Sequence, residues 1–191
     1  VDFENKKLIA KNDDVYSYDS LLISTGSENK KLSLDNNLKN DVYYLRNLEE
    51  AKKIKEIVSN KNKITIIGGG FIGLEIASSL SQLQKKVIVI EIGSQLMGRI
   101  IPKQIADLVQ KTHLENGNKI ILNKQIDKIT KKNGIYEILL SDNSLIQTDF
   151  IIAGIGSTPS VKLFENTNLK LDNGIVTNQF CETSIKDVYA A

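Results

Sequence analysis

A glycine-rich turn between two runs of β-branched residues constrains this fold more than any other feature. The run "KITII" at 63–67 precedes "GGGFIG" at 68–73, and "LEIASSLSQLQ" and "KVIVIE" follow. A short apolar run, a tight turn, an amphipathic stretch and a second apolar run are typical of a βαβ unit. The right-handed crossover of such a unit places both strands parallel in one sheet. The sequence therefore predicts an α/β fold.

The spacing of Gly68, Gly70 and Gly73 indicates a dinucleotide-binding turn. Gly68 permits the tight turn, Gly70 lets the backbone approach a pyrophosphate at the helix N-terminus, and Gly73 lets the helix lie close to the strand. Glu91 ends the second strand, where an acid accepts hydrogen bonds from an adenosine ribose 2′-hydroxyl and repels a 2′-phosphate. The alternative is a structural turn in some other α/β domain.

Glu75 places a carboxylate one turn into the helix that follows the glycines. The helical period puts Ile72, Ile76, Leu80 and Leu83 on the face expected to pack on the sheet. Glu75 then lies on the flank and can point along the crevice, toward the amide or the positively charged ring of a nicotinamide. The helix N-terminus offsets part of the cost of that carboxylate. The alternative is a solvent-facing or capping glutamate.

Further elements follow from turn signals and periodicity. The runs "KKLIA" and "DVYSY" predict a hairpin, and "SLLIST" predicts a buried strand that ends at Gly26. Asn47 is suited to cap the helix "LEEAKKIKEIVS", and Pro102 to open a helix that ends at Gly117. Four runs, "KIIL", "QIDKIT", "YEILL" and "SLIQT", predict an antiparallel meander, and "DFIIAGIGSTPS" a buried strand that ends in a glycine loop.

Composition excludes several functional classes. The net charge of +2, with acids and bases interspersed, offers no basic patch for nucleic acid or a membrane surface. No apolar run approaches the roughly 18 residues of a spanning helix. The single histidine, His113, has no cysteine or second histidine nearby, so no metal site is expected. A cytoplasmic protein is the expectation.

Several motifs occur in order along the whole chain: "YDSLLISTGS", "YLRNLEEA", "GGGFIGLE", "LMGRIIP", "DFIIAGIGSTP" and "NGIVTNQFCETSIKDVYAA". Together they resemble the middle of a two-dinucleotide flavoprotein of the pyridine nucleotide–disulfide oxidoreductase fold. Within it, the chain is most similar to the NADH-dependent ferredoxin, rubredoxin and putidaredoxin reductases. Because the chain opens without methionine and stops inside an apolar run, we expect a segment of a longer protein.

The resemblance implies a domain organisation. Residues 37–157 would form a Rossmann-like NAD(H)-binding domain, a parallel sheet with its βαβ unit plus the antiparallel meander. Residues 1–36 and 158–191 would be pieces of the FAD-binding domain that it interrupts. The apolar runs "LLIST" and "VYAA" in those pieces would either pair with each other or remain exposed edges.

The resemblance also implies roles for single residues. Thr25 and Gly26 would lie close to the flavin nucleotide, and Glu75 near the nicotinamide where it stacks on the flavin. Arg99 would belong to a loop over the adenosine end, and the glycine loop at 154–156 would pass the nicotinamide. The residues expected to bind NAD are therefore Gly68, Gly70, Phe71, Ile72, Gly73, Glu75, Glu91, Arg99, Ile155 and Gly156.

The implied function is that of an FAD-dependent oxidoreductase. It would pass hydride from NADH to FAD, and electrons on to a small iron–sulfur protein of the ferredoxin or rubredoxin type. The segment itself contains no redox residue and is expected to be inactive alone. The alternatives are an NADH oxidase, a coenzyme A–disulfide reductase or a nitrite reductase large chain of the same fold. An apoptosis-inducing-factor-like protein that senses NADH is a further alternative.

Overall fold

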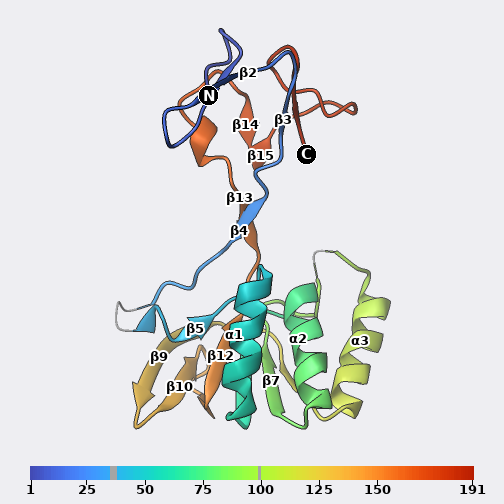
Figure 1. Cartoon of the computed structure of the whole chain (residues 1–191). Helices are drawn as coiled ribbons and strands as arrows, with labels where there is room; N and C mark the ends of the chain where they lie inside the picture. Colours follow the sequence, from blue (N-terminus) through green and yellow to red (C-terminus); the bar gives the residue numbers. More distant parts are fainter. Residues whose placement is uncertain (35–37, 99) are drawn as a thin grey trace. The chain divides into compact units, whose positions relative to one another are not determined.

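The computed structural model describes residues 1–34, 38–98 and 100–191. The chain divides into two compact units. Unit 2 is the continuous stretch Asn29–Gly156, whereas unit 1 combines Val1–Glu28 with Ser157–Ala191. Figure 1 labels the helices and strands of both units.

Unit 2 is built on a parallel sheet in the strand order β5-β12-β6-β7-β8. The predicted βαβ unit is present as β6 (Lys63–Ile67), α2 (Phe71–Gln82) and β7 (Lys86–Ile90), and β6 and β7 pair in parallel. On the other side of β6 lies β12 (Phe150–Ala153), also parallel. The α/β fold expected from the sequence is therefore confirmed.

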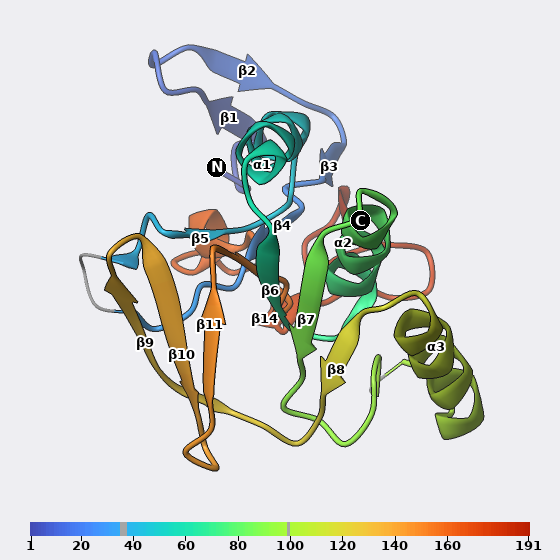
Figure 2. The same ribbon diagram turned by 90° about the horizontal axis from the view of Figure 1, so that it is seen from below.

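The remaining elements of unit 2 complete the sheet and cover it. Strand β5 (Val42–Tyr43) forms one edge next to β12, and β8 (Lys119–Ile121) forms the other edge next to β7. The helices are α1 (Leu48–Ser59), α2 and α3 (Lys103–Glu115), and the meander strands are β9 (Ile126–Lys132), β10 (Ile135–Leu140) and β11 (Leu145–Thr148). Figures 1 and 2 show the helices on one face of the sheet and the meander on the other.

Both faces of the sheet are buried, which explains the unbroken β-branched runs in its strands. Ile64 and Ile66 of β6 join the core formed with the helices, whereas Ile67 joins the core formed with the meander. In β12, Ile152 and Ile151 divide in the same way. Alternate side chains thus enter two different hydrophobic cores, as the period of a β-strand requires.

Helix α2 packs on the sheet through its small residues. The residues facing inward are Gly73, Leu74, Ile76, Ala77 and Leu80, and Ala77 is fully buried. The prediction that Ile72 and Leu83 would pack on the sheet is wrong, because their exposed fractions are 45% and 59%. The small residues permit the closest approach to the strands, so they decide which way the helix faces.

The predicted antiparallel meander has three strands rather than four. Strand β10 pairs antiparallel with both β9 and β11. The first predicted member, "KIIL", instead forms β8 and pairs in parallel with β7. The prediction for this run is wrong because α3 separates β7 from β8, and a long crossover connection joins parallel strands.

Two predicted helix ends are borne out. The side-chain oxygen of Asn47 accepts the N–H of Glu50 (2.9 Å) and caps α1. At the end of α3, Gly117 has a φ of +82°, and its N–H donates to the carbonyl oxygen of Leu114 (3.0 Å). Pro102 is the residue before the first helical residue, Lys103, rather than the first helical residue itself.

Unit 1 contains short strands and a small core. The predicted hairpin is present as β1 (Lys7–Ile9) and β2 (Val15–Ser17). The apolar runs "LLIST" and "VYAA" form β3 (Leu21–Ile23) and β16 (Val188–Ala190), which pair in parallel. Of the two expected alternatives, pairing with each other is therefore the one observed. Strand β3 is buried on one side only, since Ile23 is 5% exposed and Leu22 is 61% exposed.

Two further short strand pairs lie between β3 and β16 in the sequence. Strand β4 (Ser27–Asn29) pairs with β13 (Ser157–Pro159), and β14 (Leu171–Asp172) pairs with β15 (Gly174–Ile175). A 3₁₀ turn at Lys162–Phe164 precedes the second pair. The core of the unit consists of Ile23, Phe164, Leu169, Val188 and Ala190.

The two buried threonines of unit 2 allow a test of this packing. Thr65 is fully buried in β6, and its hydroxyl has no hydrogen-bond partner among the described residues, whereas the hydroxyl of Thr148 donates to the carbonyl oxygen of Lys63 (2.9 Å). We expect Thr65→Val to raise the free energy of unfolding by about 1 kcal/mol and Thr148→Val to lower it by about 1 kcal/mol. Urea unfolding measures both, and a shift of the two variants in the same direction would contradict the assignment.

Candidate functional site

Three neighbouring strands of unit 2, β12, β6 and β7, end at one edge of the sheet because they are parallel. The glycine turn follows β6 at this edge, which is where open α/β sheets bind ligands. The N–H of Gly68 donates to the carbonyl oxygen of Ile90 at the end of β7 (2.8 Å). After β12, the N–H of Gly154 donates to the carbonyl oxygen of Ile67 (2.8 Å). The turn and the adjoining loop are thus fixed to the strand ends.

Gly68 and Gly73 occupy positions that have no room for a side chain. Gly68 has a φ of +104°, and a Cβ on it would overlap the carbonyl oxygen of Gly154. A Cβ on Gly73 would overlap the carbonyl oxygen of Gly68 and lie 3.3 Å from Cγ2 of Ile66. Helix α2 therefore approaches β6 closely through Gly73, as its position in the motif predicts.

Gly70 differs from these two glycines because the space beside it is open. Among the described residues, no atom outside its chain neighbours lies within 4 Å of the position of a Cβ on Gly70. Gly70 is also the N-cap residue of α2, and it supplies no side-chain hydrogen bond to the first turn. Backbone N–H groups at the positive end of a helix thus border open space, an arrangement that fits an anion such as a pyrophosphate.

Glu91 lies directly after β7 with both carboxylate oxygens engaged. Oε2 accepts the N–H of Gly69 (2.7 Å), and Oε1 accepts the N–H of Gly93 (2.7 Å). An ionised carboxylate has about four acceptor positions, so each oxygen retains capacity for a ribose hydroxyl. The acid that the sequence singles out therefore has a fixed position beside the glycine turn.

The loop after β7 also contacts the turn directly. The N–H of Met97 donates to the carbonyl oxygen of Gly69 (2.9 Å), and Leu96 is fully buried. A Cβ on Gly69 would lie 2.6 Å from Cδ2 of Leu96. The spacing motif does not single out Gly69, although the unbroken triplet of glycines is a signal that could have drawn attention to it. Arg99, the predicted arginine of this loop, lies outside the described residues.

Three predicted site residues lie on the outer side of the first turns of α2. Phe71 is 51% exposed and Ile72 45% exposed, and Glu75 is exposed as well. Among the described residues, the carboxylate of Glu75 makes no hydrogen bond and no ion pair. These side chains are accessible to a ligand.

The loop after β12 contributes backbone rather than side chains to this edge. Gly154, which is not among the predicted binding residues, lies against the turn, since a Cβ on it would be 3.4 Å from the nitrogen of Gly73. Ile155 packs against the core formed with the meander. Gly156 has a φ of +102°, and its carbonyl oxygen accepts the N–H of Lys30 (3.0 Å). Only glycine adopts such a φ without strain.

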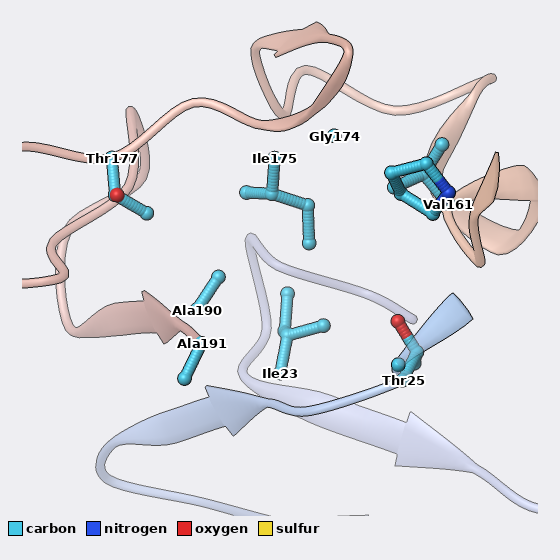
Figure 3. Close-up of a pocket in the computed structure, with 10 residues that line it drawn as sticks. Ile23, Thr25, Val161, Gly174, Ile175, Thr177, Ala190 and Ala191 are labelled. Atoms are coloured by element: carbon cyan, nitrogen blue, oxygen red, sulfur yellow. The ribbon is translucent and has the colours of Figure 1, made fainter. Parts of the chain in front are cut away.

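Unit 1 contains a separate cavity with a volume of about 250 Å³, shown in Figure 3. Thr25 and Gly26, the residues predicted to lie near a flavin nucleotide, line it. Ile23 and Ile175 point toward each other across it, and Ala190 and Ala191 line another side. Ligand pockets commonly measure about 300–1,000 Å³, so this cavity fits a part of a dinucleotide rather than a whole one.

Two other features of the described residues bear on function. No group of three or more histidine, cysteine, aspartate or glutamate side chains in residues 1–34, 38–98 and 100–191 is arranged to hold a metal ion. Within the same ranges, no helix has the length and apolarity needed to cross a membrane.

Comparison with known proteins defines the class to which this fold and site belong. Residues 1–191, the whole chain, match the family described as pyridine nucleotide-disulphide oxidoreductase. The chain belongs to this family, which confirms the resemblance inferred from its motifs.

Particular relatives lie among the NAD-linked reductases. The chain is 31% identical over 191 residues to a rubredoxin-NAD(+) reductase of Pseudomonas putida, in a match that covers 100% of this chain and 50% of that protein. The ferredoxin reductase for the CYP199A2 system from Rhodopseudomonas palustris is similar with a TM-score of 0.94 and 27% identity, over 100% of this chain and 47% of that one.

A second solved structure is the covalent putidaredoxin reductase–putidaredoxin complex, with a TM-score of 0.91 and 26% identity over 100% of this chain and 47% of that one. The chain thus spans about half the length of the curated relatives that it matches.

Proposed function

We propose that this chain is the NADH-binding part, with adjoining FAD-binding pieces, of an FAD-dependent oxidoreductase. The observation that carries the proposal is the open, uncapped turn at Gly70 with the carboxylate of Glu91 fixed beside it. In this proposal, residues 37–157 form the NAD(H) domain, and residues 1–36 and 158–191 belong to the FAD domain. A cytoplasmic location is part of the same proposal.

The residues of unit 2 would bind and orient NADH. The N–H groups at the start of α2 would receive the pyrophosphate, and Glu91 would accept a hydrogen bond from the adenosine ribose. Phe71, Ile72 and Glu75 would face the nucleotide along the helix, and Ile155 and Gly156 would contact it from the loop after β12. Arg99 would cover the adenosine end.

In unit 1, Thr25 and Gly26 would contact part of the FAD at the cavity that they line. FAD supplies the redox chemistry when it is bound, because it accepts hydride and passes electrons on singly. The names of the relatives support a small iron–sulfur protein as acceptor, since they describe a rubredoxin reductase, a ferredoxin reductase and a reductase captured with putidaredoxin. We propose an acceptor of the ferredoxin or rubredoxin type for this protein.

Nucleotide preference tests the proposed NADH site. We expect NADH to bind about 100-fold more tightly than NADPH, because a 2′-phosphate beside Glu91 would bring like charges together in a partly buried place. The carboxylate cannot easily turn away, since two backbone N–H groups hold it. Titration calorimetry of the chain with each nucleotide measures the ratio. Equal affinities, or tighter binding of NADPH, would contradict the assignment of Glu91.

The role of Glu75 can be tested in the FAD-containing enzyme. We expect Glu75→Gln to leave the free energy of unfolding within about 0.5 kcal/mol of wild type, because the side chain is exposed. Flavin reduction by NADH should slow, because the substituted side chain no longer places a negative charge near the nicotinamide. Stopped-flow absorbance measures the rate, and Glu56→Gln, an exposed acid on α1, is the matched control. An unchanged rate and charge-transfer absorbance would make Glu75 a surface acid only.

A further inference from the structure

We infer that Glu91 is a positioning residue that holds the glycine turn and the loop after β7 in one arrangement, in addition to any contact with a ribose. The inference rests on the proposed NADH site. It assigns to Glu91 a function in the free protein, before any nucleotide binds. This function concerns the glycine turn, which would receive the pyrophosphate that NADH and NADPH share.

The hydrogen bonds of Glu91 connect two segments that are separate in the sequence. One carboxylate oxygen accepts the N–H of Gly69 within the turn, and the other accepts the N–H of Gly93 within the loop, each at 2.7 Å. Hydrogen bonds from backbone N–H groups to an ionised carboxylate are among the stronger ones in proteins. A side chain needed only to contact ribose from the strand end would not require either bond.

Gly69 has both of its backbone hydrogen-bonding groups committed to this loop. Its N–H binds Glu91, and its carbonyl oxygen accepts the N–H of Met97 (2.9 Å). The fully buried Leu96 lies against the same residue, in the space where a side chain at position 69 would be. Both peptide groups that flank the Cα of Gly69 are therefore hydrogen-bonded to residues that follow β7.

The backbone around Glu91 is fixed in turn to the end of β8. The N–H of Glu91 donates to the carbonyl oxygen of Ile121 (2.8 Å), and the carbonyl oxygen of Gly93 accepts the N–H of Asn123 (3.0 Å). Through the carboxylate, the turn that would receive the pyrophosphate is hydrogen-bonded to a residue whose backbone is fixed to the sheet. Because that turn serves both nucleotides, removal of the carboxylate should weaken NADH binding, and for NADPH the loss of positioning should offset part of the gain from removing the like charge.

The first test is made on the free protein with Glu91→Gln. Glutamine has the shape of glutamate, but its amide group has one acceptor oxygen and would face the other backbone N–H with its NH₂ donors. We expect the exchange of the Gly69 or Gly93 amide hydrogen to become about tenfold faster, as the loss of one hydrogen bond to a charged acceptor implies. NMR-detected exchange measures this, and the amide of Gly154, bound to Ile67, is the internal control that should not change.

The second test uses NADH that lacks the adenosine 2′-hydroxyl. If Glu91 positions the turn, Glu91→Gln should weaken this analogue about as much as NADH, by roughly tenfold in titration calorimetry. Glu56→Gln, which removes one exposed negative charge elsewhere, should change neither affinity.

Two results separate the inference from the proposed function. Unchanged amide exchange, together with a loss confined to nucleotides that carry the 2′-hydroxyl, would overturn the positioning role and leave Glu91 as a ribose contact. Failure of the wild-type chain to bind any of these nucleotides would overturn the proposed function, while faster exchange in Glu91→Gln would still establish that the carboxylate holds the turn.

Discussion

Replacement of Gly73 by alanine is expected to lower the free energy of unfolding by about 3 kcal/mol. The added methyl group would overlap the carbonyl oxygen of Gly68 and press on Ile66, and both neighbours belong to the tightly held turn and strand. Helix α2 would have to move away from β6, which would open the core around Ala77 and Leu80. Urea or thermal unfolding of the variant measures the loss.

Nucleotide binding by Gly73→Ala should also be lost, because the start of α2 moves together with the turn. A stability within about 1 kcal/mol of wild type would contradict the close approach of α2 to the sheet at this residue. Gly70→Ala is the matched control. It adds the same methyl group to the same turn, but at a position where the space is open.

Replacement of Gly70 by alanine is expected to lower the affinity for NADH about 100-fold while the protein stays folded. Gly70 has a φ of −82°, which alanine readily adopts, and no described atom outside its chain neighbours lies where the methyl group would go. The gain from a less flexible unfolded chain and the poorer N-cap roughly cancel, so the free energy of unfolding should change by less than about 0.5 kcal/mol. The methyl group would instead occupy the space in which the backbone has to approach the pyrophosphate.

Titration calorimetry with NADH and with ADP measures this effect, since both ligands contain the two linked phosphates. Equal losses for the two ligands would locate the clash at the phosphates. An unchanged affinity for both would mean that the open space beside Gly70 is not the phosphate site, and the proposed function would lose its main support.

Local sequence patterns were sufficient to predict most elements of this fold. The βαβ unit could be predicted because turn glycines separate β-branched runs whose alternate residues enter two cores, so neither run needed a polar face. The hairpin of unit 1 and the cap at Asn47 depend on a few adjacent residues, and these are also present as expected. Elements whose hydrogen-bond partners lie a few residues apart in the sequence can therefore be predicted from local patterns.

The errors arose where distant segments decide the outcome. In α2 apolar residues occur on more than one face, because Phe71 and Ile72 are exposed while Leu74 and Leu80 are buried, so periodicity alone could not show that the small residues would face the sheet. The run "KIIL" has the composition of any short strand, and its place beside β7 depends on the path of α3.

The same limit applies to the candidate site. The glycine spacing and Glu91 were recognisable in the sequence, but the hydrogen bonds from Gly69 and Gly93 to that carboxylate were not. Those bonds, and the contact of Gly154 with the turn, exist only because three strand ends meet at one edge of the sheet. Spacing motifs identify the residues that would approach a ligand, whereas the residues that support them come from elsewhere in the chain.

The parallel pairing of β3 with β16 has a consequence for the order of folding. Unit 2 is one continuous stretch of chain, so all of its contacts can form once Gly156 has been synthesised. Unit 1 depends on contacts between Leu21–Ile23 and Val188–Ala190, which cannot form until Ala190 has been synthesised. During synthesis β3 therefore remains without its partner strand while unit 2 completes its fold, and an unpaired apolar strand of this kind is prone to associate with other chains.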